Sequence, residues 1–273
     1  ESFREGSQIA SSRDVSSLLE HAVQKACAEI YGMAEKDSEK RGMGTTLSAL
    51  LVIGNHGFIA HVGDSRIYLL RGGRVVQLTE DHSLVNELIK RGKLRKEDAE
   101  ASPYKNAVTR AVGVYESVEV DTIDFDVLPG DQFLLASDGL TGYLQNDEIA
   151  PILDGQDDIE KTPGAFIDLA NDRGGKDNIT SVVVRMVDAD GSADRLTEEV
   201  NLKIVTLRGM PLFKFLAYKE LVRVMNITRV VEVGEEEEVI KEGDEGEDLF
   251  LVLTGSVNVH KGETVIVTLR DGA

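Results

Sequence analysis

The chain has little of what marks secreted or membrane-spanning proteins. It contains one cysteine, Cys27, which excludes an intrachain disulfide. Cys27 lies in a segment with helical periodicity, so we interpret it as a small buried hydrophobic side chain in a reducing compartment. No apolar run approaches the length of a membrane span, and residues 1–4 do not begin a signal peptide. We therefore expect a cytoplasmic protein with no membrane partner.

Positive charge is also scarce. Lys and Arg number 30 against 49 Asp and Glu, which gives a net charge of −19 at pH 7. Phosphate groups would be repelled, so nucleic acid is excluded as the main partner, whereas divalent cations would be attracted. The hydrophobic fraction of 41% is that of a globular protein, and 273 residues allow one large or two ordinary domains.

The first part of the chain predicts a helix followed by short strands. Apolar positions over 15–33 lie on one face of an amphipathic helix, with Asp14 as a candidate N-cap. The period then changes, and we interpret the next apolar runs as an antiparallel meander. These runs are 45–53, 58–62, 67–70 and 75–78. Residues 83–91 return to helical spacing, which Gly92 ends.

The middle of the chain continues the mixture of helices and strands. Residues 93–105 are polar and predict a mobile surface excursion. The alternation over 118–127 changes parity between Val120 and Ile123, which indicates a bulge. We expect a strand at 132–136, a helix at 165–170 and a buried strand at 179–187. Helices on both sides of antiparallel strands indicate an α+β layered domain.

A change of composition marks a domain boundary. The segment 188–193 is small, polar and turn-forming. We therefore divide the chain into a domain at 1–188, a linker at 189–208 and a small β-rich module at 209–273. The module opens with a short helix, and its predicted strands are 230–233, 239–240, 249–253, 256–259 and 265–269.

Three acidic motifs stand at the ends of apolar runs. Asp64 follows the run 58–62, Asp138 follows 133–136, and Asp177 precedes 179–187. A carboxylate at a strand end is held by the sheet and faces solvent, which suits a binding site. With no Cys/His cluster beside them, three such carboxylates favour a hard cation such as Mg²⁺ or Mn²⁺. The pattern is typical of a metal-dependent phosphohydrolase.

Each of these residues also has a purely structural interpretation. Asp138 could cap a following helix, because Asp is favoured at that position. Asp177 could belong to an Asp-Asn loop before a strand, and Asp64 could serve only the tight turn that Gly-Asp-Ser-Arg makes. His82, a candidate proton donor, also fits a role in organising the entry to the 83–105 segment.

Seven motifs in a fixed order resemble the metal-dependent serine/threonine protein phosphatases of the type 2C, or PPM, class. Together they span about two-thirds of the chain, which makes the combined signal specific. They are GMGTT at 42–46, HVGDSR at 61–66, LTEDHS at 78–83, VTRAVG at 108–113, LPGD at 128–131, LLASDGL at 134–140 and DNIT at 177–180.

The resemblance implies a central antiparallel β-sandwich flanked by helices in αββα layers, with a two-metal site at one end. It implies Asp138 and Asp177 as ligands of Mn²⁺ or Mg²⁺, with a third, weaker ion held by Asp64 and Asp138. Such a pair of ions activates a water molecule, so no protein nucleophile is needed. The implied activity is hydrolysis of phosphoserine and phosphothreonine in proteins, including serine/threonine kinases of a bacterial cell.

Two motifs of that family have no counterpart in this sequence. One is an Asn-Glu-Asp stretch preceded by Arg, and the other is Asp-Gly-x-Gly-Gly-His. In the family they supply the metal-bridging Asp, a phosphate-binding Arg and a proposed general acid. We expect the chain to be an N-terminally truncated part of a longer enzyme. The alternative is a non-catalytic signalling module, a pseudophosphatase.

The tail resembles the first part of a cyclic-nucleotide-binding domain, a β-roll. The resemblance is carried by positions 212–213, 220–221, 234, 240, 242–244, 246, 248–250, 253 and 255–257. The sequence ends before the cassette that grips ribose and cyclic phosphate in that family. We therefore expect a cyclic nucleotide to be a partner only of a longer, intact chain.

Overall fold

The computed structural model describes residues 11–99, 101–155, 158–187, 193–216, 218–243, 246, 248–262 and 264–271. The chain forms two compact units, Glu1–Ala193 and Asp194–Ala273. Across these described ranges, every helix is too short or too polar to cross a lipid bilayer.

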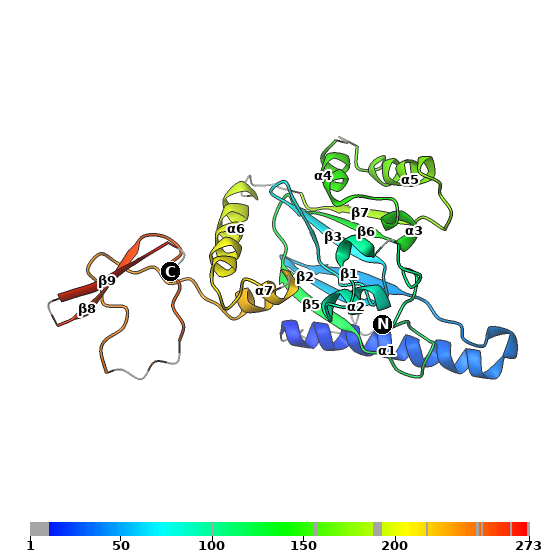
Figure 1. Cartoon of the computed structure of the whole chain (residues 1–273), viewed down its shortest axis with the longest axis horizontal. Helices are drawn as coiled ribbons and strands as arrows, with labels where there is room; N and C mark the ends of the chain where they lie inside the picture. Colours follow the sequence, from blue (N-terminus) through cyan, green and yellow to red (C-terminus); the bar gives the residue numbers. More distant parts are fainter. Residues whose placement is uncertain are drawn as a thin grey trace. The chain divides into compact units, whose positions relative to one another are not determined.

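The first unit is built on two antiparallel sheets, visible between the helices in Figure 1. Phe125 of one sheet and Phe133 of the other bring their ring centroids within 5.9 Å, so the sheets pack face to face. The first sheet has the order β1 (Leu47–Ile53), β2 (His56–Val62), β5 (Asp121–Asp126). The second has the order β4 (Arg74–Gln77), β3 (Arg66–Arg71), β6 (Gln132–Ala136), β7 (Ser181–Arg185).

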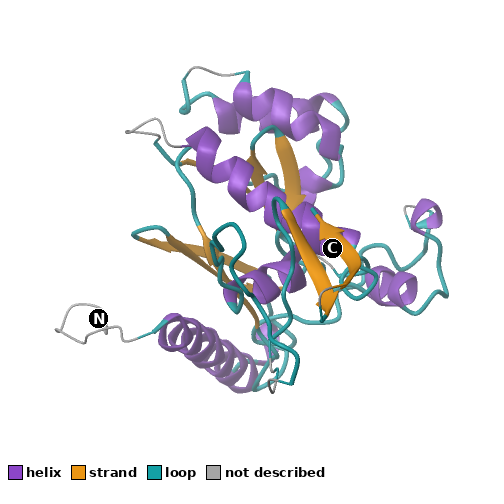
Figure 2. Cartoon of the chain, turned by 90° about the vertical axis from the view of Figure 1, so that its left-hand side faces the viewer, coloured by secondary structure: helices purple, strands orange, loops and turns teal. Residues whose placement is uncertain are grey.

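Helices cover the outer face of each sheet, which gives the layers of Figures 1 and 2. The long helix α1 (Ser12–Lys36) packs on the first sheet, where Cys27 is fully buried against Ala60 and Val62. Helices α4 (Asn146–Asp154) and α5 (Thr162–Asp172) pack on the second. The expected α+β fold with helices on both sides of antiparallel sheets is confirmed.

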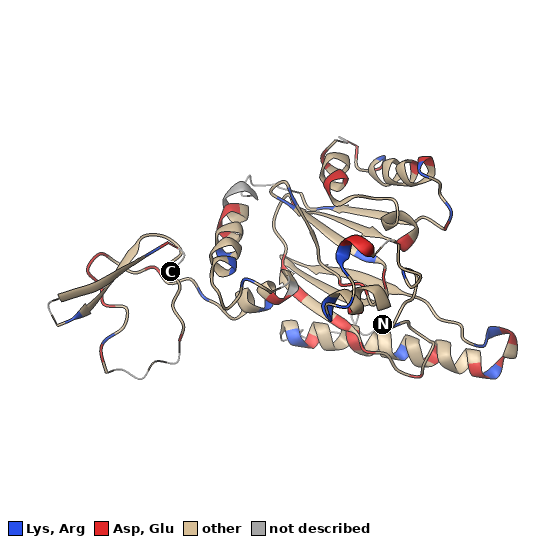
Figure 3. Cartoon of the chain, viewed as in Figure 1, with Lys and Arg blue, Asp and Glu red and all other residues tan. Residues whose placement is uncertain are grey.

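Helix α1 begins earlier than its periodicity suggests. The Oγ of Ser11 accepts a hydrogen bond from the backbone N–H of Asp14 at 3.4 Å, so Ser11 is the N-cap. The prediction of Asp14 as the cap was wrong; its carboxylate lies in the first turn, where it suits the helix dipole. Figure 3 shows charges of both signs along α1, as expected for a helix with a solvent-facing side.

Shorter helices connect the strands. Helix α2 (Leu84–Lys90) is capped by Ser83, whose Oγ accepts from the Asn86 N–H at 3.2 Å, and Gly92 follows with φ +65°. The predicted helix at 83–91 is thus confirmed. The remaining short helices of this unit are η1 (Ser38–Lys40), η2 (Lys96–Asp98) and α3 (Asp138–Thr141).

The predicted meander is wrong in one respect that matters for the site. Strands β1 and β2 form a hairpin, and so do β3 and β4, but β2 and β3 lie in different sheets. The chain changes sheet at residues 63–65, because Gly63 takes φ +113°, a conformation that L side chains rarely adopt. The alternation of apolar and polar residues along a strand cannot distinguish this change of sheet from a hairpin turn.

Two strand predictions also need correction. The pairing of β5 with β2 is regular over its whole length, so the bulge expected between Val120 and Ile123 is absent there. Val118 and Val120 instead precede the strand and pack against α1, where the Gln24 amide donates to the Val118 carbonyl. Strand β7 covers only part of 179–187, and Val187 beyond it is exposed.

The second unit contains two helices and a hairpin among its described residues. These are α6 (Ala193–Gly209), α7 (Tyr218–Asn226), β8 (Ser256–Lys261) and β9 (Thr264–Arg270). Leu221 of α7 is fully buried against Ile204 and Leu207 of α6. The predicted stretches 230–233, 239–240 and 249–253 carry no strand, so the described part of the tail has a hairpin in place of a β-roll.

Candidate metal site

The strand register brings the three predicted ligands to one end of the second sheet. Arg66 of β3 pairs with Ala136 of β6, and Ala136 in turn pairs with Ser181 of β7. Asp64 lies two residues before Arg66, Asp138 two residues after Ala136, and Asp177 four residues before Ser181. Strands that start or stop at the same level deliver their flanking loops to the same edge.

Asp138 and Asp177 stand side by side because Gly139 has no side chain. A Cβ at Gly139 would lie 2.3 Å from the Asn178 carbonyl oxygen and 3.4 Å from the Asp177 Cβ. Ser137 joins the same two loops, since its Oγ accepts from the Thr180 N–H at 3.0 Å. The Asp177 loop therefore packs directly against the Ser-Asp-Gly motif.

Both of these carboxylates are exposed to solvent and accept only short-range backbone hydrogen bonds. Asp138 Oδ1 accepts from the Gly139 N–H at 2.9 Å, and Asp177 Oδ1 accepts from the Asn178 N–H at 2.7 Å. Each carboxylate has a second oxygen, and an ionised carboxylate has about four lone-pair sites. Both can therefore bind a cation without losing these contacts.

Asp64 reaches the site from the connection between the two sheets. At Gly63, a Cβ would lie 2.3 Å from Thr46 Cγ2, so this turn requires glycine. The turn is held on its other side by Thr46 Oγ1 and Ser65 Oγ, 2.9 Å apart, and by Ser48 Oγ, which donates to the Ser65 carbonyl at 3.0 Å. The threonine hydroxyl thus supports the Asp64 turn.

The negative charges at this edge are close enough to interact. The pKa of Asp64 is raised from its ordinary value, first by partial burial and then by the charges of Asp138 and Asp81. Repulsion between neighbouring carboxylates disfavours the ionised form, and a bound cation would relieve it.

Sequence analysis gave no role to Asp81, which lies behind Asp64. The guanidinium of Arg66 donates to its carboxylate through Nε at 2.9 Å and Nη2 at 2.6 Å, and Gln77 Nε2 donates at 3.0 Å. Arg66 Nη1 also donates to the Tyr68 hydroxyl at 3.1 Å. Asp81 follows the end of β4 as Asp138 follows the end of β6, so the signal that identified Asp138 was available here too.

The residues present fit a hard divalent cation by donor type. Among the described residues, no three His, Cys, Asp or Glu side chains form a group that could hold a metal. Mg²⁺ needs no such cage, because it is usually bound by one or two carboxylates together with waters and substrate phosphate oxygens. The neighbouring pair Asp138 and Asp177, with Asp64 beside them, meets that requirement.

Two histidines whose rings pack against each other at a tilt lie next to the Asp64 turn. The rings of His61 and His82 are 4.8 Å apart and both are buried. His61 Nε2 lies 3.0 Å from the Glu80 carbonyl and Nδ1 lies 2.8 Å from Ser48 Oγ. Burial, followed by the proximity of His82, lowers the pKa of His61 to about 4. His61 is thus a neutral structural residue at physiological pH.

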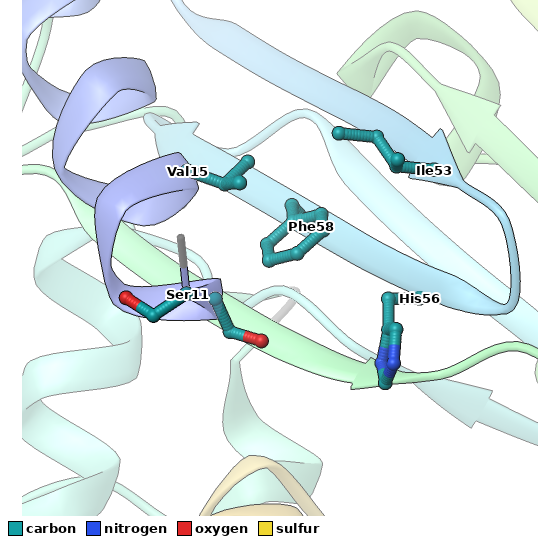
Figure 4. A pocket seen from close by; sticks show the side chains of 6 residues that line it. Ser11, Val15, Ile53, His56 and Phe58 are labelled. Atoms are coloured by element: carbon teal, nitrogen blue, oxygen red, sulfur yellow. The ribbon is translucent and has the colours of Figure 1, made fainter. Parts of the chain in front are cut away.

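A small hollow of about 190 Å³ lies at the opposite end of β2 (Figure 4). Ser11, Val15, Ile53, His56 and Phe58 are among its lining residues. None of the predicted ligands lines it. Asp138 and Asp177 lie at a different place, on the solvent-exposed edge of the second sheet.

Comparison with known proteins agrees with this geometry. The family model for protein phosphatase 2C matches residues 2–179. The serine/threonine phosphatase stp of Listeria monocytogenes is 40% identical over 184 residues, which cover 67% of this chain and 73% of the relative. Protein phosphatase PhpP of Streptococcus pneumoniae is 40% identical over 183 residues, which cover 67% and 74%.

Solved structures show the same fold. The serine/threonine phosphatase Stp1 from Staphylococcus aureus has a TM-score of 0.63 at 31% identity, with 69% of this chain and 74% of that chain covered. The catalytic domain of the phosphatase PstP, solved in complex with two manganese ions, has a TM-score of 0.59 at 33% identity, with 66% and 75% covered.

The two packed sheets and their acidic edge are those of a metal-dependent phosphatase. This chain belongs to the protein phosphatase 2C family and is a protein serine/threonine phosphatase of the bacterial type. Members of this family use Mn²⁺ or Mg²⁺.

Proposed function

We propose that Asp138 and Asp177 bind two divalent ions, Mn²⁺ or Mg²⁺, and that Asp64 with Asp138 binds a third, weaker one. The register that joins Arg66, Ala136 and Ser181 carries this proposal, because it accounts for the convergence of three separate loops. The substrates are phosphoserine and phosphothreonine proteins, among them serine/threonine kinases, in the cytoplasm.

The ions, when bound, supply an activated water and neutralise charge on the phosphoryl oxygens. The protein's part is to hold oxygen ligands in fixed positions at the sheet edge. Asp138 and Asp177 are exposed and open to a phosphoprotein, whereas Asp64 is half-buried behind them. Burial first, and then the charges of Asp138 and Asp81, raise the pKa of Asp64, and a bound cation would favour its ionised form.

The direct test is hydrolysis of a phosphothreonine peptide with and without Mn²⁺. Replacement of Asp138 by Asn should reduce the Mn²⁺-dependent rate by at least ~100-fold, because loss of a metal ligand removes most of the charge stabilisation. Asp126 is a carboxylate at the far end of β5, so Asp126→Asn is the matched control and should keep the wild-type rate. Equal rates in Asp138→Asn and wild type would refute the assignment.

We infer further that full turnover needs the Asp-Gly-x-Gly-Gly-His segment, which this sequence does not contain. The assay should be repeated with that segment supplied in an extended chain. A large gain in rate would support truncation of the metal site. No gain in rate would refute the requirement for that segment.

The tail is proposed to belong to a cyclic-nucleotide-binding module that regulates the phosphatase. The support is the run of matching residues between Leu212 and Val257, and the described part contributes only the β8–β9 hairpin. Titration calorimetry with cyclic AMP and cyclic GMP, on this chain and on a longer one, tests the proposal. Binding by neither chain would remove it.

A further inference from the structure

His82 holds the residue next to Asp64 at two points. Its backbone N–H donates to the Gly63 carbonyl at 2.8 Å, and its ring Nδ1 accepts from the Gly63 N–H at 3.1 Å. Both polar groups of the Gly63 backbone are therefore satisfied by one residue. Gly63 has φ +113°, so the regular backbone hydrogen bonds between neighbouring strands do not hold this turn in place.

These contacts give the two ring nitrogens different surroundings. A backbone N–H can only donate, so Nδ1 is the acceptor of the hydrogen bond from Gly63. Nε2 lies 3.6 Å from Asp121 Oδ2 and 3.2 Å from Arg110 Nη1. Arg110 in turn donates to Asp121 Oδ1 at 3.0 Å. Neither ring nitrogen faces the carboxylate edge, so His82 is not placed to give a proton to a leaving group.

The His82 ring is also immobilised by its surroundings. His82 is 6% exposed, and its ring packs against the tilted ring of His61. The His82 backbone carbonyl accepts from the Thr109 N–H at 2.7 Å. The residue thus connects the Asp64 turn to the loop at Thr109. A side chain held on several sides can transmit a fixed position to its partner.

We propose that His82 is a positioning residue for Asp64. Through the hydrogen bond from Gly63 to Nδ1, it fixes the turn that directs the Asp64 carboxylate toward Asp138, and so sets the affinity of this edge for its weaker cation. This inference rests on the proposed function, because it takes Asp64 as a ligand.

Three substitutions separate this role from a general structural one. His82→Asn keeps an acceptor at the position of Nδ1, whereas His82→Leu keeps the volume and has no acceptor. His56→Leu replaces a half-exposed histidine at the far end of β2 and is the control. The measurements are Mn²⁺ titration followed by electron paramagnetic resonance, hydrogen exchange of the Gly63 amide by NMR, and thermal stability.

We expect His82→Leu to weaken the lowest-affinity Mn²⁺ site roughly tenfold and to speed exchange of the Gly63 amide, because a buried donor loses its partner. His82→Asn should stay within about twofold of wild type in both. Wild-type Mn²⁺ affinity in folded His82→Leu, or equal losses in the Asn and Leu variants, would overturn the proposal.

Two further variants keep the test decisive. If His82→Leu does not fold, His82→Gln replaces it; its acceptor lies one bond further out, so it must bind Mn²⁺ more weakly than His82→Asn. Asp64→Asn tests the foundation. An unchanged Mn²⁺ titration in Asp64→Asn would refute Asp64 as a ligand and the proposed third ion with it, and would leave the proposed site at Asp138 and Asp177 standing. A changed titration there, with none in His82→Leu, would refute only the positioning role.

Discussion

Gly139 determines how closely Asp177 can approach Asp138. Gly139→Ala would place a methyl group 2.3 Å from the Asn178 carbonyl oxygen, so the Asp177 loop would have to move. We expect a loss of roughly 1–3 kcal/mol in the free energy of unfolding, together with weaker Mn²⁺-dependent activity. Urea denaturation and the phosphopeptide assay measure the two effects.

Gly164 provides the control for that substitution. It lies in α5, and a Cβ there would meet no atom within 4 Å. Gly164→Ala should therefore stabilise the protein by about 0.5–1 kcal/mol, since alanine has the better helix propensity, and leave activity unchanged. Equal behaviour of the two alanine variants would show that the space around Gly139 is not limiting.

His61 makes stability depend on pH. Its pKa is lowered in the folded protein to about 4 from 6.5, so the unfolded chain binds a proton first as the pH falls. Stability is then complete above pH 6.5 and is lost progressively toward pH 4, by roughly 3 kcal/mol at the lower limit. His61→Gln should flatten the curve of unfolding free energy against pH in that range; an unchanged slope would contradict this account.

Between elements, a buried ion pair joins β3 to the turn before β6. Arg71 donates to Asp131 through Nε at 2.8 Å and Nη2 at 2.6 Å, and Asp131 also accepts from the Leu128 N–H at 2.8 Å. Arg71 is 7% and Asp131 1% exposed. A charge left there without its partner would be poorly solvated, so the pair fixes the geometry of this turn.

A double-mutant cycle tests that pair. Arg71→Met and Asp131→Asn should each cost roughly 3–5 kcal/mol of unfolding free energy, because each strands one buried charge. The double variant removes both charges and keeps an acceptor for the Leu128 N–H, so it should cost clearly less than the sum. Strict additivity in urea denaturation would mean that the two groups stabilise the fold independently.

The positions of the helices and strands could be predicted from the sequence better than the pairing of the strands. Helices α1 and α2 and strand β6 follow from local periodicity and from end signals such as Gly92. The change of sheet at Gly63 could not be read, because alternation records which face is buried and not which strand is the neighbour. Helix α4 was missed, since Pro151 in its interior weakens the helical pattern.

The site was predicted as three separate residues rather than as a geometry. Each carboxylate was predicted as a ligand from its place beside an apolar run, a local signal. Their convergence depends on the pairing of β3, β6 and β7, strands far apart in the sequence. The contact of His82 with Gly63 is also invisible to local reasoning, because it joins residues nineteen positions apart.

For the whole molecule, we expect two unfolding transitions in calorimetry. Each compact unit has a hydrophobic core of its own, one around Phe166 and Leu134 and the other around Leu221 and Leu207. Mn²⁺ should raise the midpoint of only the first unit, since the proposed ligands belong to it and a ligand stabilises the state that binds it. Asp138→Asn should abolish this shift; a shift of both transitions would contradict the assignment of the ions to one unit.

The change of sheet at Gly63 has a consequence for the proposed weaker ion. Asp138 and Asp177 are both attached to the second sheet, whereas Asp64 lies in the connection between the two sheets. The distance from Asp64 to the other two carboxylates therefore depends on how the two sheets pack. Core residues such as Phe125 and Phe133, which pack between the sheets, therefore help to set that distance. If Asp64 is a ligand as proposed, substitutions in this core would change the affinity for the weaker ion at positions that never contact a substrate.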